Sequence, residues 1–513
     1  MPGSLEFSFE FSGMGGDGPR KPGAHEPIRI LLIADLAGRE NRGLPAEKSL
    51  SDRIPARVDV DNFEDLLRRM APAVSLAVGA GENSAEQQSL DIEFRELDDF
   101  GPEALYQNLG LFQSLRNLRQ RLLDPATYDE AADFMKRGTE TASDAVDELP
   151  VKPQGSAEAG SQFEQLLGGT PVRETAAGQS ARSAIDRLVG SIVAPHIEKA
   201  VDPQQAQLLS AVDDSVSEQM RHLLHHPDFQ SLEAVWRGVH DLVTSLETGE
   251  ELQIFLLDVT RSELLADFRA ANGQLDRSGL YRILVEKGLH TPGGLVWSLL
   301  VGNFEFGTAD NDLALLAGMG AIASQAGAPF LAAAKPELLG CPAIHEAPDP
   351  HDWQLDDEAE QAWAALRRLP VARSVGLALP RVLARLPYGK EADEIDLFTF
   401  EEVTGADDHA RYLWGNPALS CAKLAAMSWL EAEALCEPGE LLDLSDLPAC
   451  TYLDEGERKL MPCAETLLSE RAADHIASHG IMPIMSYRDR NSARLLRFQS
   501  IASPPAGLRG AWR

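Results

Sequence analysis

The first regular pattern of hydrophobic and polar positions lies in "LEFSFEFS", which begins at Leu5. Leu5, Phe7, Phe9 and Phe11 would point to one side of an extended chain, with glutamate and serine on the other. This period of two predicts a half-buried β-strand, which has to pair with a sheet. The glycine-rich stretch "GMGGDGPRKPG" follows and would let the strand dock far from its own domain. The pattern leaves open whether the strand joins a neighbouring molecule or folds back.

A small α/β domain is predicted from about Pro27 to Lys136. "IRILLIAD" predicts a buried strand, "SLDIEFREL" a strand with alternating faces, and "DNFEDLLRRM" a helix capped by Asp61 or Asn62. Apolar residues spaced by three and four then predict one longer helix, ended by the proline of "LLDPATYDEAADF". Its buried positions would be Leu105, Leu109, Phe112, Leu115, Leu118 and Leu122.

The residues from about 138 to 180 contain few large apolar side chains and predict a flexible linker. The exception is "QFEQLLGG", where Phe163, Leu166 and Leu167 could form one turn of amphipathic helix. Such a turn could dock in the groove of a partner or pack on its own protein. Both alternatives stay open.

A larger α/β domain is predicted from residue 181 onward. Two amphipathic helices, at about 204–226 and 229–247, are separated near Pro227. Apolar strands then alternate with helical stretches. The strands are "LQIFLLDV", "GLVWSLLVGNFEF", "APFLAAA", "RSVGLALP" and "GIMPIMS". This alternation predicts a mixed sheet flanked by helices.

Composition narrows the class of protein. A chain of 513 residues is long enough for two or more domains. Its net charge of −34, from 80 acidic and 46 basic residues, argues against a nucleic-acid partner, because phosphate binding needs a basic face. No apolar run is long enough to span a membrane, and no secretory signal is apparent. We therefore expect a cytoplasmic protein without membrane insertion.

The cysteines and histidines offer no firm metal site. Cys341, Cys421, Cys436, Cys450 and Cys463 include no CxxC, so reduced thiols are expected rather than zinc or disulfides. In "RHLLHHPDF", His222 and His226 share a helix face and could hold a metal, with His225 nearby. The HExxH glutamate is absent, and a solvated helix end is the better interpretation.

Catalytic motifs are equally weak. Ser420 and Cys421 follow the turn "WGNP", but without a GxSxG frame they indicate a packed interior. The glycines of "GMGAIASQAG" form no phosphate-binding loop. We predict no catalytic, cofactor-binding or metal-binding residue, and hence no enzyme. A detached strand and a flexible middle instead favour a component of an assembly.

Longer blocks resemble a known family. "RILLIADLAGRE", "DRIPARVDVDNFEDLLRRMAPAVSL" and "LDIEFRELDDFGPEALYQNLGLFQSLRNLRQRL" resemble the small subunit of the bacterial type VI secretion contractile sheath. "HPDFQSLEAVWRGVHDLV", "FLLDVTRSELLADF", "LALLAGMGAIASQAGAPFLAAAKPELLG" and "RYLWGNPALSCAKLAA" are similar to blocks of the large subunit. The resemblance covers all but the tether and the linker.

The resemblance implies a structural protein of a cytoplasmic tube. In that family small and large subunits pair, extended strands complete the sheets of neighbouring protomers, and contraction drives an inner tube into a target cell. The implied partners are other sheath subunits, the inner tube protein and baseplate components. "LEFSFEFS" stands in the place of the small subunit's exchange strand, so Leu5, Phe7, Phe9 and Phe11 would be the subunit-interaction residues.

The linker island has an implied partner too. "QFEQLLGG" lies where the large subunit carries a short helix recognised by a Clp-type AAA+ unfoldase, with Phe163, Leu166 and Leu167 as the contacts. Six family-block positions are expected to hold core and corner places of the scaffold. They are Trp236, Asp258, Gly294, Arg381, Trp414 and Asn416.

Two departures from the family pattern affect the expected function. The two subunits are joined, which predicts a small-subunit-like domain at 1–137, a linker at 138–180 and a large-subunit-like domain at 181–513. The sequence also stops roughly a hundred residues before the family's large subunit usually does. We therefore expect either a polymerising sheath protomer that assembles by strand exchange or a non-polymerising cap, adaptor or baseplate-proximal component.

Overall fold

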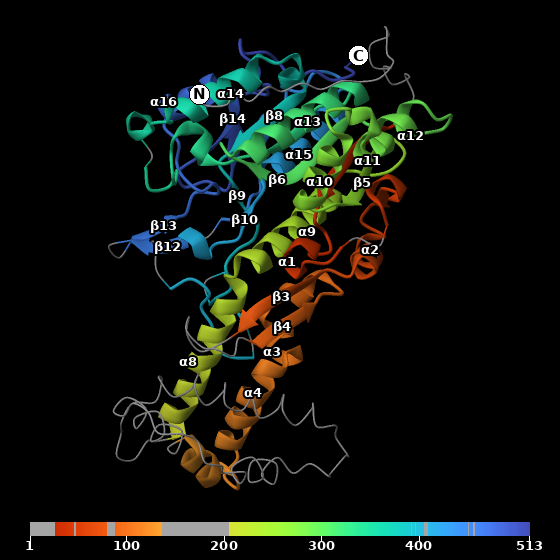
Figure 1. Ribbon diagram of the computed structural model, residues 1–513. Helices are drawn as coiled ribbons and strands as arrows, with labels where there is room; N and C mark the ends of the chain where they lie inside the picture. Colours follow the sequence, from red (N-terminus) through yellow and green to blue (C-terminus); the bar gives the residue numbers. More distant parts are fainter. Residues whose placement is uncertain are drawn as a thin grey trace, which may run out of the picture.

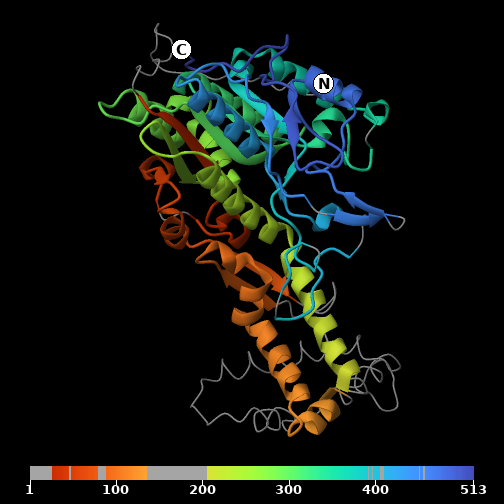
Figure 2. The same cartoon turned by 180° about the vertical axis from the view of Figure 1, so that it is seen from behind.

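The computed structural model describes residues 26–135 and 205–512, apart from gaps at 46–47, 79–87, 348, 391, 396, 405–408, 450 and 455–456. These residues form one body from which a pair of helices projects (Figures 1 and 2). The strand predicted at Leu5–Phe11, the helical turn predicted at Phe163–Leu167, and Cys450 lie outside the described residues.

A nine-stranded sheet forms the centre of the body, in the order β11-β15-β14-β8-β7-β6-β1-β5-β2 (Figure 1). Six adjacent strands run parallel, namely β14 (Ile481–Ser486), β8 (Val375–Leu379), β7 (Phe330–Ala334), β6 (Leu299–Phe306), β1 (Ile28–Ala34) and β5 (Leu252–Asp258). Three shorter strands, each paired antiparallel with the strand next to it, complete the two ends. They are β2 (Ala56–Val58), β15 (Ala493–Leu495) and β11 (Asp443–Leu444). The predicted α/β class with a mixed sheet is confirmed.

Helices cover both faces of this sheet. One face packs on α2 (Phe63–Met70), α9 (Pro227–Ser245) and α15 (Pro417–Glu431). The other packs on α10 (Arg261–Ala271), α11 (Gly279–Tyr281), α13 (Asp310–Ala326), α14 (Asp357–Arg368) and α16 (Glu470–Ser478), with α12 (Lys287–Leu289) beyond a π-helical turn. Because both faces are covered, the parallel strands are apolar almost throughout, as such strands require.

The projecting pair consists of α4 (Gly110–Leu123) and α8 (Gln205–Leu224), which lie side by side (Figures 1 and 2). Arg119 Nε donates to Asp213 Oδ1 at 2.7 Å, and Gln205 Nε2 donates to the Leu122 carbonyl at 2.6 Å. The prediction of a single helix over Leu105–Leu122 is wrong, because the structure has two helices there. The chain is divided into α3 (Pro102–Asn108) and α4, because Leu109 has extended dihedral angles (φ −80°, ψ 134°) that apolar spacing cannot reveal.

Three two-stranded antiparallel sheets lie outside the main sheet. They pair β3 (Ala73–Val78) with β4 (Gln88–Glu93), β9 (Val382–Leu383) with β10 (Trp414–Gly415), and β12 (Thr451–Asp454) with β13 (Glu457–Leu460). The β3 strand packs beside the short helix α1 (Arg39–Arg42). The β12–β13 pair stands away from the body in Figure 1.

Candidate functional site at the seam of the sheet

The candidate site is the seam, where residues 26–135 (the N segment) meet residues 205–512 (the C segment) around the carboxyl end of β1. Strand β1 of the N segment pairs in parallel with β5 on one side and β6 on the other, both from the C segment. Residues Ile30–Ala34 have no exposed surface. A strand in this position cannot leave without opening the sheet, so the two segments share one core.

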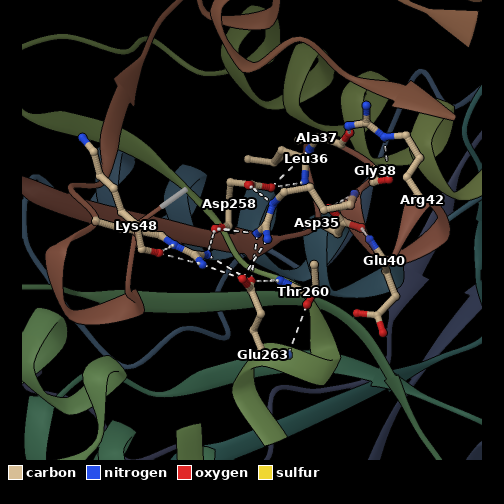
Figure 3. Close-up of polar contacts among 12 residues, drawn as sticks. Asp35, Leu36, Ala37, Gly38, Glu40, Arg42, Lys48, Asp258, Thr260 and Glu263 are labelled. Atoms are coloured by element: carbon tan, nitrogen blue, oxygen red, sulfur yellow. Dashed lines mark hydrogen bonds and ion pairs between the residues drawn. The ribbon is translucent and has the colours of Figure 1, made fainter. Parts of the chain in front are cut away.

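Asp258, the last residue of β5, holds the turn that follows β1 (Figure 3). Its Oδ1 accepts hydrogen bonds from the backbone N–H groups of Leu36 and Ala37, at 2.8 and 3.1 Å. Its Oδ2 accepts from Arg39 Nε at 2.8 Å. A single C-segment carboxylate therefore fixes both the turn and the first side chain of α1.

The Glu263 carboxylate accepts hydrogen bonds from two arginines of the N segment (Figure 3). Arg39 donates to both carboxylate oxygens, at 2.7 and 2.8 Å, and Arg53 Nη2 donates at 2.6 Å. Glu263 is held by a capping box, in which Thr260 Oγ1 accepts from the Glu263 N–H and Glu263 Oε2 accepts from the Thr260 N–H. Burial raises the pKa of Glu263, but the hydrogen bonds from Arg39 and Arg53 outweigh it and lower the pKa to about 2.

Two further contacts align the turn. The Asp35 carboxylate accepts hydrogen bonds from the backbone N–H groups of Arg39 and Glu40, at 2.9 and 2.8 Å. These bonds satisfy two N–H groups at the start of α1 that have no partner within the helix. Burial nevertheless raises the pKa of Asp35, with these hydrogen bonds opposing it. The fully buried Trp236 of α9 donates its indole Nε1–H to the Leu36 carbonyl at 2.9 Å.

Gly38 lets the turn pass close to β3. Its φ of 69° lies in the left-handed region, and a Cβ at this position would lie 2.2 Å from the Ala73 carbonyl oxygen. The Ala73 N–H bonds the Ala37 carbonyl at 3.2 Å, so β3 is tied to the same turn. Any larger side chain would push these two backbone stretches apart.

The side chains of the seam are suited to holding the two segments together rather than to catalysis. The Glu263 carboxylate is ionised and already bound by two guanidinium groups, which leaves it unsuited to proton transfer. Among the residues that the structure describes, no group of three or more His, Cys, Asp or Glu side chains is placed to hold a metal ion. The arrangement can therefore fix the N segment to the C segment.

Sequence reasoning singled out two residues of the seam, Trp236 and Asp258, as core and corner positions. The other four such positions lie elsewhere. Arg381 Nη2 donates to Glu465 at 2.6 Å, Asn416 caps α15 by accepting from the Ala418 N–H, and the Trp414 indole donates to the His409 carbonyl. A Cβ on Gly294 would lie 2.1 Å from the Lys287 carbonyl oxygen.

The three histidines of "RHLLHHPDF" do not come together as one site. His222 is exposed, as expected for a solvated helix end. His226 caps α9, its Nδ1 accepting from the Asp228 N–H at 3.3 Å. His225 departs from the expectation, because burial, Arg411 and Arg385 lower its pKa to about 4, with Glu402 3.8 Å from its Nε2.

Cys421 lies inside α15 with no exposed surface, so the predicted packed interior is confirmed. Burial raises the pKa of its thiol to about 12, which keeps the thiol protonated and a poor nucleophile. Cys341, Cys436 and Cys463 are also free thiols.

Sequence reasoning missed Arg39, Arg53 and Glu263. All three lie inside blocks that carried the family resemblance, yet their charges gave no sign of pairing. The available signal was local. Thr260–Glu263 follows a strand with the spacing of a capping box, and Arg39 follows another strand after a glycine turn. Only the fold brings them together.

Comparisons with known proteins match the C segment and the N segment to two different families. Residues 206–502 match the family VipB, described as EvpB/VC_A0108, tail sheath N-terminal domain. Residues 22–141 match the type VI secretion system family described as VipA, VC_A0107 or Hcp2. No helix among the described residues is long and apolar enough to cross a membrane.

Two proteins of Pseudomonas aeruginosa are similar to the chain. The type VI secretion system sheath protein TssC1 is 31% identical over 340 residues, which is 64% of this chain and 67% of TssC1. The type VI secretion system sheath protein TssB1 is 35% identical over 104 residues, which is 20% of this chain and 58% of TssB1. The chain thus spans less than two thirds of TssB1. Because the VipB match covers more than half of the chain, this protein belongs to the tail-sheath family of the type VI secretion system, and it carries a VipA-like segment on the same polypeptide.

Proposed function

We propose that this chain is a fused structural subunit of the type VI secretion contractile sheath, located in the bacterial cytoplasm. The observation that carries the proposal is the position of β1. A strand of the VipA-like segment lies between two strands of the VipB-like segment. The two parts thus act as one protomer of fixed one-to-one composition. We retain the division into 1–137, a linker at 138–180, and 181–513 as part of this proposal.

The subunit assembles by strand exchange, with Leu5, Phe7, Phe9 and Phe11 of one copy joining a sheet of its neighbour. The described ends of the main sheet argue against docking there. Next to β2, Pro55 has no N–H, and the Asn62 side chain bonds both the Arg57 carbonyl and the Asp59 N–H. At the other end, β11 has only two residues.

The β12–β13 pair is the more suitable acceptor. Its four register pairs, Thr451↔Leu460 to Asp454↔Glu457, leave the outer edges of both strands without a further described strand. A two-stranded sheet is only marginally stable in water by itself, so an added strand would stabilise it. Main-chain hydrogen bonds would supply affinity, and the alternating side chains would set the register.

The proposal includes further partners, which the sequence resemblance implies. They are other sheath subunits, the inner tube protein, baseplate components and a Clp-type AAA+ unfoldase that contacts Phe163, Leu166 and Leu167. The unfoldase contact predicts that the double variant Phe163→Ala, Leu166→Ala loses binding to a purified unfoldase of this type. Undiminished binding would remove that contact from the proposal. The proposal includes no catalytic step.

Negative-stain electron microscopy of the purified full-length chain, alone and mixed with conventional sheath subunits, tests the proposal. Tubes that contain the chain throughout would support a polymerising protomer. Discrete particles found only at tube ends would instead identify a cap or adaptor. In either case Phe9→Lys should prevent assembly, whereas the neighbouring polar-face change Ser8→Lys should not. Equal assembly by both variants would contradict strand exchange through this segment.

A further inference from the structure

A polar cleft lies at the carboxyl edge of the parallel sheet, beyond the seam. It has a volume of about 870 Å³ and is lined by residues that follow or end β6, β7 and β8. A smaller hollow of about 190 Å³ continues it to the end of β1 and shares Asn303 and Arg261 with it. The smaller hollow borders the seam, since Asp35 and Gly38 line it, whereas the larger cleft is lined only by residues of the C segment.

The cleft occupies the place where open α/β sheets bind ligands. Strand β5 lies on one side of β1, and β6, the next parallel strand along the chain, lies on the other. The connections therefore diverge at β1 and β6, which leaves a crevice outside the carboxyl ends of these strands. This position does not by itself determine the ligand, which depends on the side chains that line the cleft.

Strand β6 is irregular where it reaches the cleft. Val301 pairs with Leu331 and Glu305 pairs with Ala333, so three residues of β6 face one of β7. Such bulges re-aim a side chain, and they occur often beside functional sites. Asn303 is the central bulged residue, and its side-chain amide forms no hydrogen bond with any other described residue. An unpaired amide thus lines the cleft from within the central sheet.

Two arginines line the cleft with their carboxylate partners behind them. Arg261 bonds Asp312, and Arg381 bonds Glu465. The exposed fractions of the arginine side chains are 28% and 38%, whereas those of the carboxylate side chains are 11% and 6%. The positive end of each pair is therefore the end nearer solvent. Each guanidinium group has five N–H donors, and its single carboxylate does not use them all.

Lys335, directly after β7, adds a cation that has no ion pair within the described part of the chain. The lining also contains two carboxylates outside the arginine pairs, Glu305 and Glu337. The cleft is therefore no general attractant for polyanions. Recognition has to come from directional donors, which favours a compact group with several acceptor oxygens.

We propose that this cleft binds a small anionic ligand through a phosphate or carboxylate group, with Lys335, Asn303 and the two arginines as donors. All four donors belong to the C segment, so the ligand lies outside the carboxyl ends of β6, β7 and β8. This binding goes beyond the structural role of the subunit, and its failure would leave that role unaffected.

Isothermal titration calorimetry, in which the full-length chain is titrated with pyrophosphate and separately with citrate, tests the proposal. We expect saturable binding that weakens with added salt, and the tighter probe identifies the ligand class. Lys335→Ala and Asn303→Asp should each weaken binding by about tenfold or more, since each removes a donor to a charged group. Lys390→Ala, an exposed lysine outside the cleft, is the matched control and should leave binding unchanged.

Thermal unfolding of each variant checks that the fold is retained. We expect it to be, because neither Lys335 nor Asn303 has a side-chain hydrogen bond or ion pair with another described residue. Two results would overturn the proposal. The first is no saturable binding of either probe at millimolar concentration. The second is equal weakening by Lys335→Ala and Lys390→Ala, which would mean that only the overall charge is sensed.

Discussion

Arg39 and Glu263 are 224 residues apart in the sequence and meet through two parallel hydrogen bonds of 2.7 and 2.8 Å. Paired bonds between guanidinium and carboxylate fix the angle as well as the distance between two groups. Here they fix the first helix after β1 to the first helix after β5. The ion pair therefore forms only when the N segment is packed in its native position against the C segment.

Removal of the Glu263 charge should loosen the seam. Glu263→Gln leaves Arg53 with no carboxylate partner among the described residues, and it leaves Arg39 with Asp258 alone. The side chains of Arg39 and Arg53 are only 9% and 12% exposed, so water compensates little for the lost charge. We expect the free energy of unfolding to fall by about 3 kcal/mol, measured by urea denaturation. The control is Asp65→Asn in the exposed Arg68–Asp65 pair, which should cost no more than about 0.5 kcal/mol. Equal effects would mean that the seam pair is no stronger than a surface pair.

The same carboxylate predicts a dependence of stability on pH. The pKa of Glu263 is about 2 in the folded chain, below its ordinary value of 4.5. The unfolded chain therefore binds the proton first, so this stability is present above pH 4.5 and is lost as the pH falls toward 2. The difference in free energy of unfolding between wild type and Glu263→Gln should shrink over that interval. A constant difference would show that Glu263 titrates normally.

The two glycines that flank α1, Gly38 and Gly43, should differ in how well they accept a Cβ atom. Gly38 and Gly43 have similar φ angles, 69° and 61°, but only Gly38 has atoms within 4 Å of an added Cβ. Gly43→Ala should cost about 1 kcal/mol from its left-handed backbone alone. Gly38→Ala should cost at least about 2 kcal/mol more, because the Ala73 carbonyl has to move. Similar thermal unfolding of the two variants would contradict this account.

Trp236 should contribute to the free energy of unfolding through its packing and through one hydrogen bond. Trp236→Ala removes a fully buried indole and should cost about 3–5 kcal/mol. Trp236→Phe keeps most of the ring but loses the bond to the Leu36 carbonyl, so a smaller loss that includes about 1 kcal/mol for that bond is expected. Unchanged solubility and melting temperature in Trp236→Ala would refute the core assignment.

The main strands were predictable because their apolar runs are continuous. "IRILLIAD" and "LQIFLLDV" predict β1 and β5 directly, and the proline at 227 separates α8 from α9 as expected. The pairing of β1 with β5 and β6 was not predictable, because hydrophobicity along a chain records burial and carries no information about which strand lies beside which. The break at Leu109 was hidden for a related reason, since the apolar spacing continues through it.

The seam was only partly predictable. Trp236 and Asp258 attracted notice as members of recognisable blocks, whereas Arg39 and Glu263 are charged residues that a pattern assigns to the surface. Their burial depends on each other and on Arg53, and each alone would be costly to bury. A mutual requirement of this kind becomes visible only when three distant stretches of chain are placed together.

The central position of β1 also affects the order of events at the ribosome. The strand is synthesised first, but its two neighbours, β5 and β6, begin only at Leu252 and Leu299. At about 5–20 residues per second, the nascent chain carries this apolar strand unpaired for on the order of 10–50 s. Folding of the N segment therefore has to wait for the C segment. Synthesis as one polypeptide ensures that the missing neighbours arrive on the same molecule.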